Sequence, residues 1–326
     1  MDLRIDELSD LTKLSHTYML TVSFNVSLQI DVYEVIGNNN YSIEELADLV
    51  NCYPKGLQRI LDLLVAINLL KFEDGRYSNT EISLKYLTCL YNSKLNDLFE
   101  YSMKSEFNAQ SVLNTISSGN NSVDTGKKNE LEKYMDAMAS GSKYSAYKLA
   151  RELKTKGNKL LLDVGCGPGI YSITLCKFNN SLKAECVDLA ECLSITKKYI
   201  EESGLRDRVS TRVCDVSEED FTDGKFYDYI LLSNILHFFD VSDIRKVLNK
   251  CYSALNTGGK IIINDIFLQK ENIETIFYSL EWLSNGTIFI SMEEMCDCLK
   301  EIGYANLRIA KIEKTPSSFI FAERII

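Results

Sequence analysis

The sequence predicts an α/β protein in which a mostly helical module precedes a domain built on a parallel sheet. From about residue 158, short apolar strands alternate with helical segments, which is typical of such a sheet. Before about residue 95, apolar residues recur at helical spacing and one short hairpin interrupts them. We therefore expect a front module in 1–95, linking helices in 96–157 with an exposed loop at 117–129, and the sheet domain in 158–326.

The front module has the order helix, helix and hairpin, which is the winged-helix pattern. Ser42 and Glu45 have the spacing of a capping box, and Pro54 suits the first turn of the next helix. Asp74-Gly75 predicts a tight turn between two short strands.

The charge of this module argues against DNA binding. Residues 1–100 carry fifteen acidic and eight basic side chains, whereas a DNA reader needs a basic face. We therefore expect a packing and dimerisation module, in which the apolar segment 12–36 supplies a surface for a partner subunit.

The composition disfavours several kinds of partner. The chain of 326 residues has a formal net charge of −10, which disfavours nucleic acid and anionic membranes. Its ten cysteines form no C-x-x-C pair, and no signal peptide is evident, so we expect reduced thiols in a cytoplasmic protein. Two histidines, His16 and His237, are too few for a histidine-rich metal site, and no apolar run is long enough for a membrane span.

A glycine-rich turn follows the first strand of the sheet domain. The strand ends at Asp163, and glycines follow at 165, 167 and 169 before a helix begins. Glycines let a ligand approach the main chain closely, and the helix N-terminus offers free N–H groups. The G-x-G-x-G spacing differs from the G-x-G-x-x-G of dinucleotide sites, and no Gly-Lys-Ser/Thr ending marks a phosphate loop.

Polar side chains end the strands that follow. Asp188 ends the second strand and can accept hydrogen bonds from both hydroxyls of a ribose. Asp215 ends the third strand, where it can meet an adenine amino group, and His237 follows the fourth. A fifth strand follows Gly258-Gly259. The carboxyl ends of parallel strands form the edge at which open α/β sheets bind ligands.

These motifs together resemble a known enzyme family. LLLDVGCGPG, SNILHFFD and ALNTGGKIIINDIF look like the class I S-adenosylmethionine (SAM)-dependent methyltransferases. The segment from IEELADLV to SLKYL is similar to the dimerisation domain of small-molecule O-methyltransferases of the caffeate, hydroxyindole and polyketide-tailoring types. The resemblance covers nearly the whole chain. It implies a Rossmann-like seven-stranded sheet, a SAM cofactor, a homodimer and a role in small-molecule biosynthesis.

The resemblance also assigns residues to the cofactor. It implies that the three glycines line the methionine and ribose side, that Asp188 holds the ribose, and that Asp215 and Val216 hold the adenine. We also expect Asp163 and Leu189 to belong to the cofactor site. Ser233 and Asn234 would lie near the methionine portion. The full set is Asp163, Gly165, Gly167, Gly169, Asp188, Leu189, Asp215, Val216, Ser233 and Asn234.

His237 takes the place of the family's general base, and a base of this kind suits a weakly nucleophilic hydroxyl. One of the two acids that orient the base aligns with Asp265, whereas the other falls near Phe289, which is not acidic. His237 is also followed by Phe-Phe-Asp rather than Asp-Trp. Tyr278, Trp282 and Phe289 lie after the fifth strand, where relatives place a substrate-lining helix. Met103 and Phe107 lie in the linking helices, and we expect these five side chains to contact the substrate.

Three other functions remain open. The first is methyl transfer to carbon or nitrogen, or a SAM-using reaction without methyl transfer, because the surroundings of His237 depart from the family pattern. The second is a SAM-sensing winged-helix regulator, which the acidic front module disfavours. The third is a NAD-dependent oxidoreductase, which the glycine spacing disfavours. The leading expectation is O-methylation of a small aromatic or polyketide-like hydroxyl compound.

Overall fold

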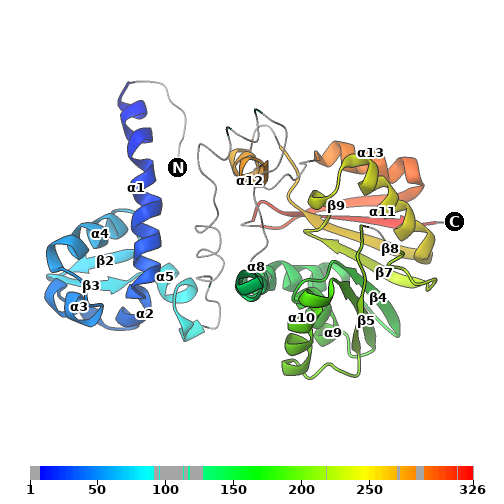
Figure 1. The fold of residues 1–326 in the computed structure, drawn as a ribbon, viewed down its shortest axis with the longest axis horizontal. Coiled ribbons are helices and arrows are strands. Elements are labelled where there is room, and N and C mark those ends of the chain that lie inside the picture. The colour runs from blue at the N-terminus through cyan, green and yellow to red at the C-terminus, as the bar shows by residue number, and fades with distance from the viewer. Residues whose placement is uncertain are drawn as a thin grey trace. The chain divides into compact units, whose positions relative to one another are not determined.

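The computed structural model describes residues 8–91, 95, 113, 117, 128–217, 219–269, 272–283, 290–313 and 315–325. They belong to two compact units, Met1–Ser105 and Glu106–Ile326 (Figure 1).

The first unit consists of helices and a small antiparallel sheet. Its helices are α1 (Leu8–Gln29), α2 (Val32–Ile36), α3 (Ile43–Leu49), α4 (Pro54–Ala66) and α5 (Glu81–Tyr86), followed by a 3-10 turn at Cys89–Tyr91. Its strands are β1 (Asn40–Tyr41), β2 (Leu70–Glu73) and β3 (Arg76–Asn79), in the order β1-β3-β2. The expected hairpin is therefore present, and β1 adds a third strand that the sequence pattern did not predict.

The local signals of this unit are confirmed. The side chain of Ser42 accepts a hydrogen bond from the N–H of Glu45, and the side chain of Glu45 accepts one from the N–H of Ser42. These two bonds form the capping box of α3. Pro54 occupies the first turn of α4. Asp74 and Gly75 both have positive φ, 51° and 77°, as the tight turn between β2 and β3 requires.

The second unit carries the large sheet. Its helices are α8 (Lys128–Leu153), α9 (Ile170–Phe178), α10 (Ala190–Glu202), α11 (Val241–Ala254), α12 (Ile273–Leu283) and α13 (Met292–Ile302), with a 3-10 turn η2 (Leu236–Phe238). Its strands are β4 (Lys159–Val164), β5 (Leu182–Asp188), β6 (Val209–Val213), β7 (Tyr227–Ser233), β8 (Leu255–Asp265), β9 (Tyr304–Lys311) and β10 (Ser318–Arg324).

The seven strands have the order β6-β5-β4-β7-β8-β10-β9, which confirms the expected seven-stranded sheet. Strands β4 to β8 are parallel, whereas β10 runs antiparallel to both β8 and β9. Helices α8, α9 and α10 pack on one face through a core that includes Leu149, Leu175 and Ile200. Helices α11 and α13 pack on the other face, through residues such as Leu248 and Leu299 (Figure 1). All five parallel strands therefore end at one edge.

Some boundaries differ from those the sequence suggested. The segment expected to form one or two helices is a single helix, α8, because Gly141 does not interrupt its hydrogen bonding. Strand β6 ends at Val213, two residues before Asp215, and β8 begins at Leu255, before the two glycines. The expected loop at 117–129 lies almost entirely outside the described residues.

All ten cysteines are free thiols, and six of them are buried. Across the parts of the chain that the structure describes, we find no helix with the length and apolar character needed to span a bilayer.

Candidate active site

The turn between β4 and α9 brings the main chain to the carboxyl end of the sheet. Gly165 has φ +64°, and its N–H donates to the carbonyl oxygen of Val187 at 2.9 Å. A Cβ at Gly165 would lie 2.7 Å from Cδ1 of Ile235. Both the backbone conformation and the close packing therefore require glycine at this position.

Asp188 connects this turn to the end of β5. Its Oδ2 accepts the N–H of Gly167 and its Oδ1 accepts the N–H of Leu189, both at 2.8 Å. Burial raises the pKa of the Asp188 carboxyl, and these two backbone hydrogen bonds oppose the rise. A Cβ at Gly167 would meet no protein atom within 4 Å, so a ligand can approach the main chain there.

Asp163, expected at the cofactor, is buried beneath the turn. Only 2% of the residue is exposed, and its Oδ2 accepts the hydroxyl of Ser172 on α9 at 2.7 Å. Burial raises the pKa of the Asp163 carboxyl to about 7, although the hydrogen bond from Ser172 acts in the opposite direction. This contact fastens α9 to β4 behind the glycines. A direct contact of Asp163 with a cofactor stays a prediction.

Replacing Asp163 with Asn should remove a pH dependence of stability. The carboxyl has a pKa of about 7 in the folded chain against an ordinary 3.8, so the folded state binds more protons between these values. The contribution of this carboxyl to the free energy of unfolding is complete below about pH 4 and is lost as the pH rises through about 7. The free energy of unfolding falls by roughly 4 kcal/mol at most over this range. Chemical denaturation from about pH 5 to about pH 8 should show the wild type losing stability relative to Asp163→Asn, and parallel profiles would contradict this role.

Asp215 and Val216 lie in the loop that follows β6. Oδ1 of Asp215 accepts the N–H and the hydroxyl of Ser217 at 2.9 and 2.5 Å, and Val216 is buried. The N–H of Cys214 donates to the carbonyl oxygen of Asp188 at 3.0 Å. The loop therefore begins beside the end of β5, next to the residue expected to bind ribose.

Ser233 ends β7 and Asn234 follows it, next to a buried amide that the sequence reasoning missed. Nδ2 of Asn264, on β8, donates to the hydroxyls of Tyr171 and Ser233 at 2.9 and 3.0 Å. Oδ1 of Asn264 is buried and has no hydrogen-bond partner among the described residues. Such an acceptor is costly to leave unpaired, so a ligand or water that donates to it would be stabilised. Its place inside an apolar strand carried no signal in the sequence.

His237 on η2 and Asp265 at the end of β8 form a close pair. Nδ1 of His237 lies 3.0 Å from Oδ1 and 3.3 Å from Oδ2 of Asp265, and the two side chains are only 10% and 6% exposed. Asp265 is itself held by the N–H of Ile266, which donates to its Oδ1 at 2.9 Å. A carboxylate that accepts Nδ1–H fixes the imidazole so that Nε2 is the basic nitrogen. This is the relation that orients a histidine for proton abstraction.

The structure says less about the expected substrate residues. Met103, Phe107 and Phe289 lie outside the described residues. Tyr278 and Trp282 both belong to α12, and Tyr278 is partly exposed. His16, which the sequence did not assign to the site, is exposed on α1 of the other unit.

Comparison with protein families identifies the chain. The sequence model of the O-methyltransferase domain matches residues 105–290, and that of the O-methyltransferase dimerisation domain matches residues 12–89. The chain belongs to the O-methyltransferase family. The expected α/β fold, the enzyme class and the dependence on SAM are thereby confirmed.

Individual relatives match either most of the chain or a part of it. The 3-hydroxy-5-methyl-1-naphthoate 3-O-methyltransferase of Streptomyces sahachiroi is 23% identical over 96% of this chain and 94% of its own length. The L-tyrosine C(3)-methyltransferase of Streptomyces lavendulae is 31% identical, over 39% of this chain and 34% of its own length. The structure of human N-acetylserotonin methyltransferase with SAM superposes with a TM-score of 0.82 at 18% identity, and the match covers 99% of both chains.

Proposed function

We propose that this methyltransferase transfers a methyl group from SAM to a hydroxyl of a small aromatic or polyketide-like compound, with His237 as the general base. The observation that supports this most strongly is the buried pair of His237 and Asp265 at the carboxyl edge of the sheet. The naphthoate O-methyltransferase that matches nearly the whole chain supports an aromatic hydroxyl acceptor.

The residues at the sheet edge fit the cofactor. Each oxygen of Asp188 accepts one backbone N–H, and a carboxylate has acceptor capacity beyond these two bonds for a ribose hydroxyl. Asp215 and Val216 would hold the adenine ring. The methionine portion would lie along Gly165, Gly167 and Gly169, near Ser233 and Asn234. Oδ1 of Asn264, which has no hydrogen-bond partner among the described residues, would supply an acceptor there.

The chemistry required of the protein is modest. SAM supplies a methyl group on a sulfonium, which is already activated toward attack. The acceptor hydroxyl is a weak nucleophile until it loses its proton, and a base placed at that oxygen lowers the barrier. His237 would take this proton on Nε2, while Asp265 holds Nδ1–H and stabilises the imidazolium that forms. Alignment of the acceptor oxygen with the methyl group supplies the remaining lowering of the barrier.

Transfer to carbon is the second candidate. The relative that matches part of this chain is named an L-tyrosine C(3)-methyltransferase, which supports transfer to carbon. A phenol that loses its proton gains nucleophilic character at the adjacent ring carbon as well as at oxygen. His237 and Asp265 could therefore support methyl transfer to oxygen or to carbon, and analysis of the product distinguishes the two reactions.

The test is an assay of the purified protein with SAM and a panel of naphthols, hydroxynaphthoates and simpler phenols. We expect a product that has gained one methyl group, with one equivalent of S-adenosylhomocysteine released. Carbon-13 NMR of the product separates an O-methyl from a C-methyl group. Release of S-adenosylhomocysteine without a methylated product would refute methyl transfer to these acceptors.

We also propose a homodimer formed through the first unit. This unit matches the O-methyltransferase dimerisation domain, and α1 exposes the apolar side chains of Leu14, Tyr18 and Met19. Apolar side chains gathered on one exposed helix favour a protein partner. Light scattering should give twice the chain mass of 37.1 kDa, and a monomer at working concentrations would overturn the proposal.

A further inference from the structure

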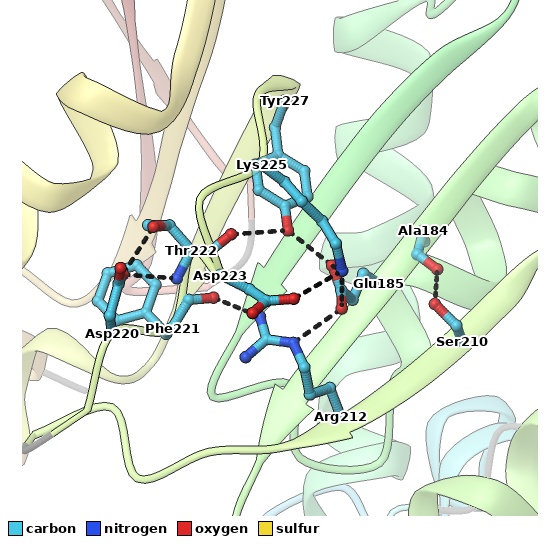
Figure 2. A network of polar contacts seen from close by, with 10 residues as sticks. All are labelled: Ala184, Glu185, Ser210, Arg212, Asp220, Phe221, Thr222, Asp223, Lys225 and Tyr227. Carbon is cyan, nitrogen blue, oxygen red and sulfur yellow. Dashed lines mark hydrogen bonds and ion pairs between the residues drawn. The ribbon is translucent and has the colours of Figure 1, made fainter.

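A buried carboxylate stands at the centre of a polar network on the face of the sheet that α11 and α13 also cover. Glu185 on β5 accepts from Nε of Arg212 at 2.9 Å, from Nζ of Lys225 at 3.1 Å and from the hydroxyl of Tyr227 at 2.6 Å (Figure 2). Its side chain is only 9% exposed. Burial raises the pKa of the Glu185 carboxyl, but the three donors outweigh it and leave the pKa below its ordinary value. Glu185 is therefore ionised at neutral pH.

The donors that bind Glu185 also hold the loop of residues 214–226. Nη2 of Arg212 donates to the carbonyl oxygen of Phe221 at 2.5 Å, and the Phe221 side chain is fully buried (Figure 2). Lys225 pairs with Asp223 in the same loop at 3.2 Å. One carboxylate on β5 therefore binds both Arg212, which holds the main chain of the loop, and Lys225, which belongs to the loop.

This loop presents the residues that we assign to the adenine. Asp215 and Val216 lie near its start, and Cys214 N–H binds the carbonyl oxygen of Asp188. Strand β5 therefore carries Asp188 at its end and, three residues earlier, the carboxylate that anchors the loop. The same strand thus contacts the loop at its start, through Asp188, and holds Phe221 within it through Glu185 and Arg212.

We propose that Glu185 is a positioning residue for the adenine end of the cofactor site, acting through Arg212 and the loop that carries Asp215. This inference rests on the proposed assignment of Asp215 and Val216 to the adenine. A guanidinium can bind a carboxylate and a carbonyl oxygen at once, which suits Arg212 to this bridge. Loss of the Glu185 charge removes one charged partner from each of two cations, Arg212 and Lys225, and lets the loop shift, whereas the groups at the reacting methyl are untouched.

The test compares Glu185→Gln with wild type by calorimetric titration with S-adenosylhomocysteine and by steady-state kinetics. We expect Kd for S-adenosylhomocysteine and KM for SAM to rise about tenfold, a size within the range of coupled neighbouring residues, while kcat at saturating SAM changes less than about twofold. The matched control is Glu323→Gln on β10, which removes a carboxylate bound to Lys260 at 2.8 Å near the opposite edge of the sheet. It should leave both constants unchanged.

A double-mutant cycle separates positioning from mere stability. If Glu185 acts through Asp215, then Glu185→Gln should weaken binding much less in an Asp215→Ala background than in the wild type. Lys225→Met removes a half-exposed donor and provides a milder variant should Glu185→Gln fail to fold, with a rise in Kd of about threefold.

Four results would overturn the proposal. Kd within twofold of wild type for a folded Glu185→Gln, or for Lys225→Met if the first variant does not fold, would show that the network only stabilises the fold. Additive effects with Asp215→Ala would show that Glu185 does not act through that residue. An unchanged Kd for Asp215→Ala would refute the adenine assignment itself, whereas failure of the wild type to bind S-adenosylhomocysteine would refute the whole cofactor site.

Discussion

His237→Ala should lower kcat by roughly 10²- to 10⁴-fold, which is the usual contribution of a positioned general base. Affinity for S-adenosylhomocysteine should stay near the wild-type value, because the imidazole acts on the acceptor and Asp265 remains in place. The measurement is steady-state kinetics with a phenolic acceptor that the wild type methylates, combined with calorimetric titration. An unchanged kcat would remove the base role.

The acidity of the acceptor provides a sharper control for this role. A dinitro-substituted phenol is already largely ionised at neutral pH, so it needs little help from a base. His237→Ala should therefore slow the methylation of such an acceptor far less than that of the unsubstituted phenol. Equal losses for the two acceptors would indicate that His237 acts by packing rather than by proton abstraction. Asp265→Asn should show the same selective pattern, because it alters the carboxylate that orients Nδ1–H.

Asp188→Ala should weaken the binding of S-adenosylhomocysteine by about 10²- to 10⁴-fold. Two hydrogen bonds from ribose hydroxyls to a charged acceptor contribute about 1.5–3 kcal/mol each. The substitution also releases the N–H groups of Gly167 and Leu189, which allows the turn to relax. Calorimetric titration measures the affinity directly, and thermal unfolding checks that the variant is folded.

Asp228→Ala is the matched control for Asp188→Ala. Asp228 also binds a backbone N–H across the sheet, that of Leu160 at 2.9 Å, but it lies near the amino ends of β4 and β7. This substitution should cost stability without changing the affinity for the cofactor. Equal affinities for all three proteins would refute the ribose role of Asp188.

Local interactions explain why much of the fold could be predicted. The capping box at Ser42 and the turn at Asp74-Gly75 depend on residues within a few positions of one another, so their patterns survive in the sequence. The glycines of the cofactor turn are equally local, because positive φ is a property of single residues. Strand β1 was missed because two residues carry too little periodicity to be recognised.

The candidate site was predictable only in part. Strand ends in a parallel sheet meet at one edge, so Asp188, Asp215 and His237 could be grouped from their order alone. The distance of His237 from Asp265 could not be predicted from the sequence, because it depends on the register of β7 with β8 and on the turn after β7. The burial of Asp163 against Ser172 likewise depends on how α9 packs on β4.

The sequence by itself determined the family, the glycine turn and the acidic residues at the strand ends, because these are short motifs read along one stretch of chain. Only the tertiary structure decided that the buried Oδ1 of Asn264 has no hydrogen-bond partner among the described residues, and that Glu185 binds the arginine that holds the carbonyl oxygen of Phe221. Both depend on side chains brought together from different strands. A carboxylate buried among three donors has no signature in sequence, since its partners lie 27 to 42 positions away.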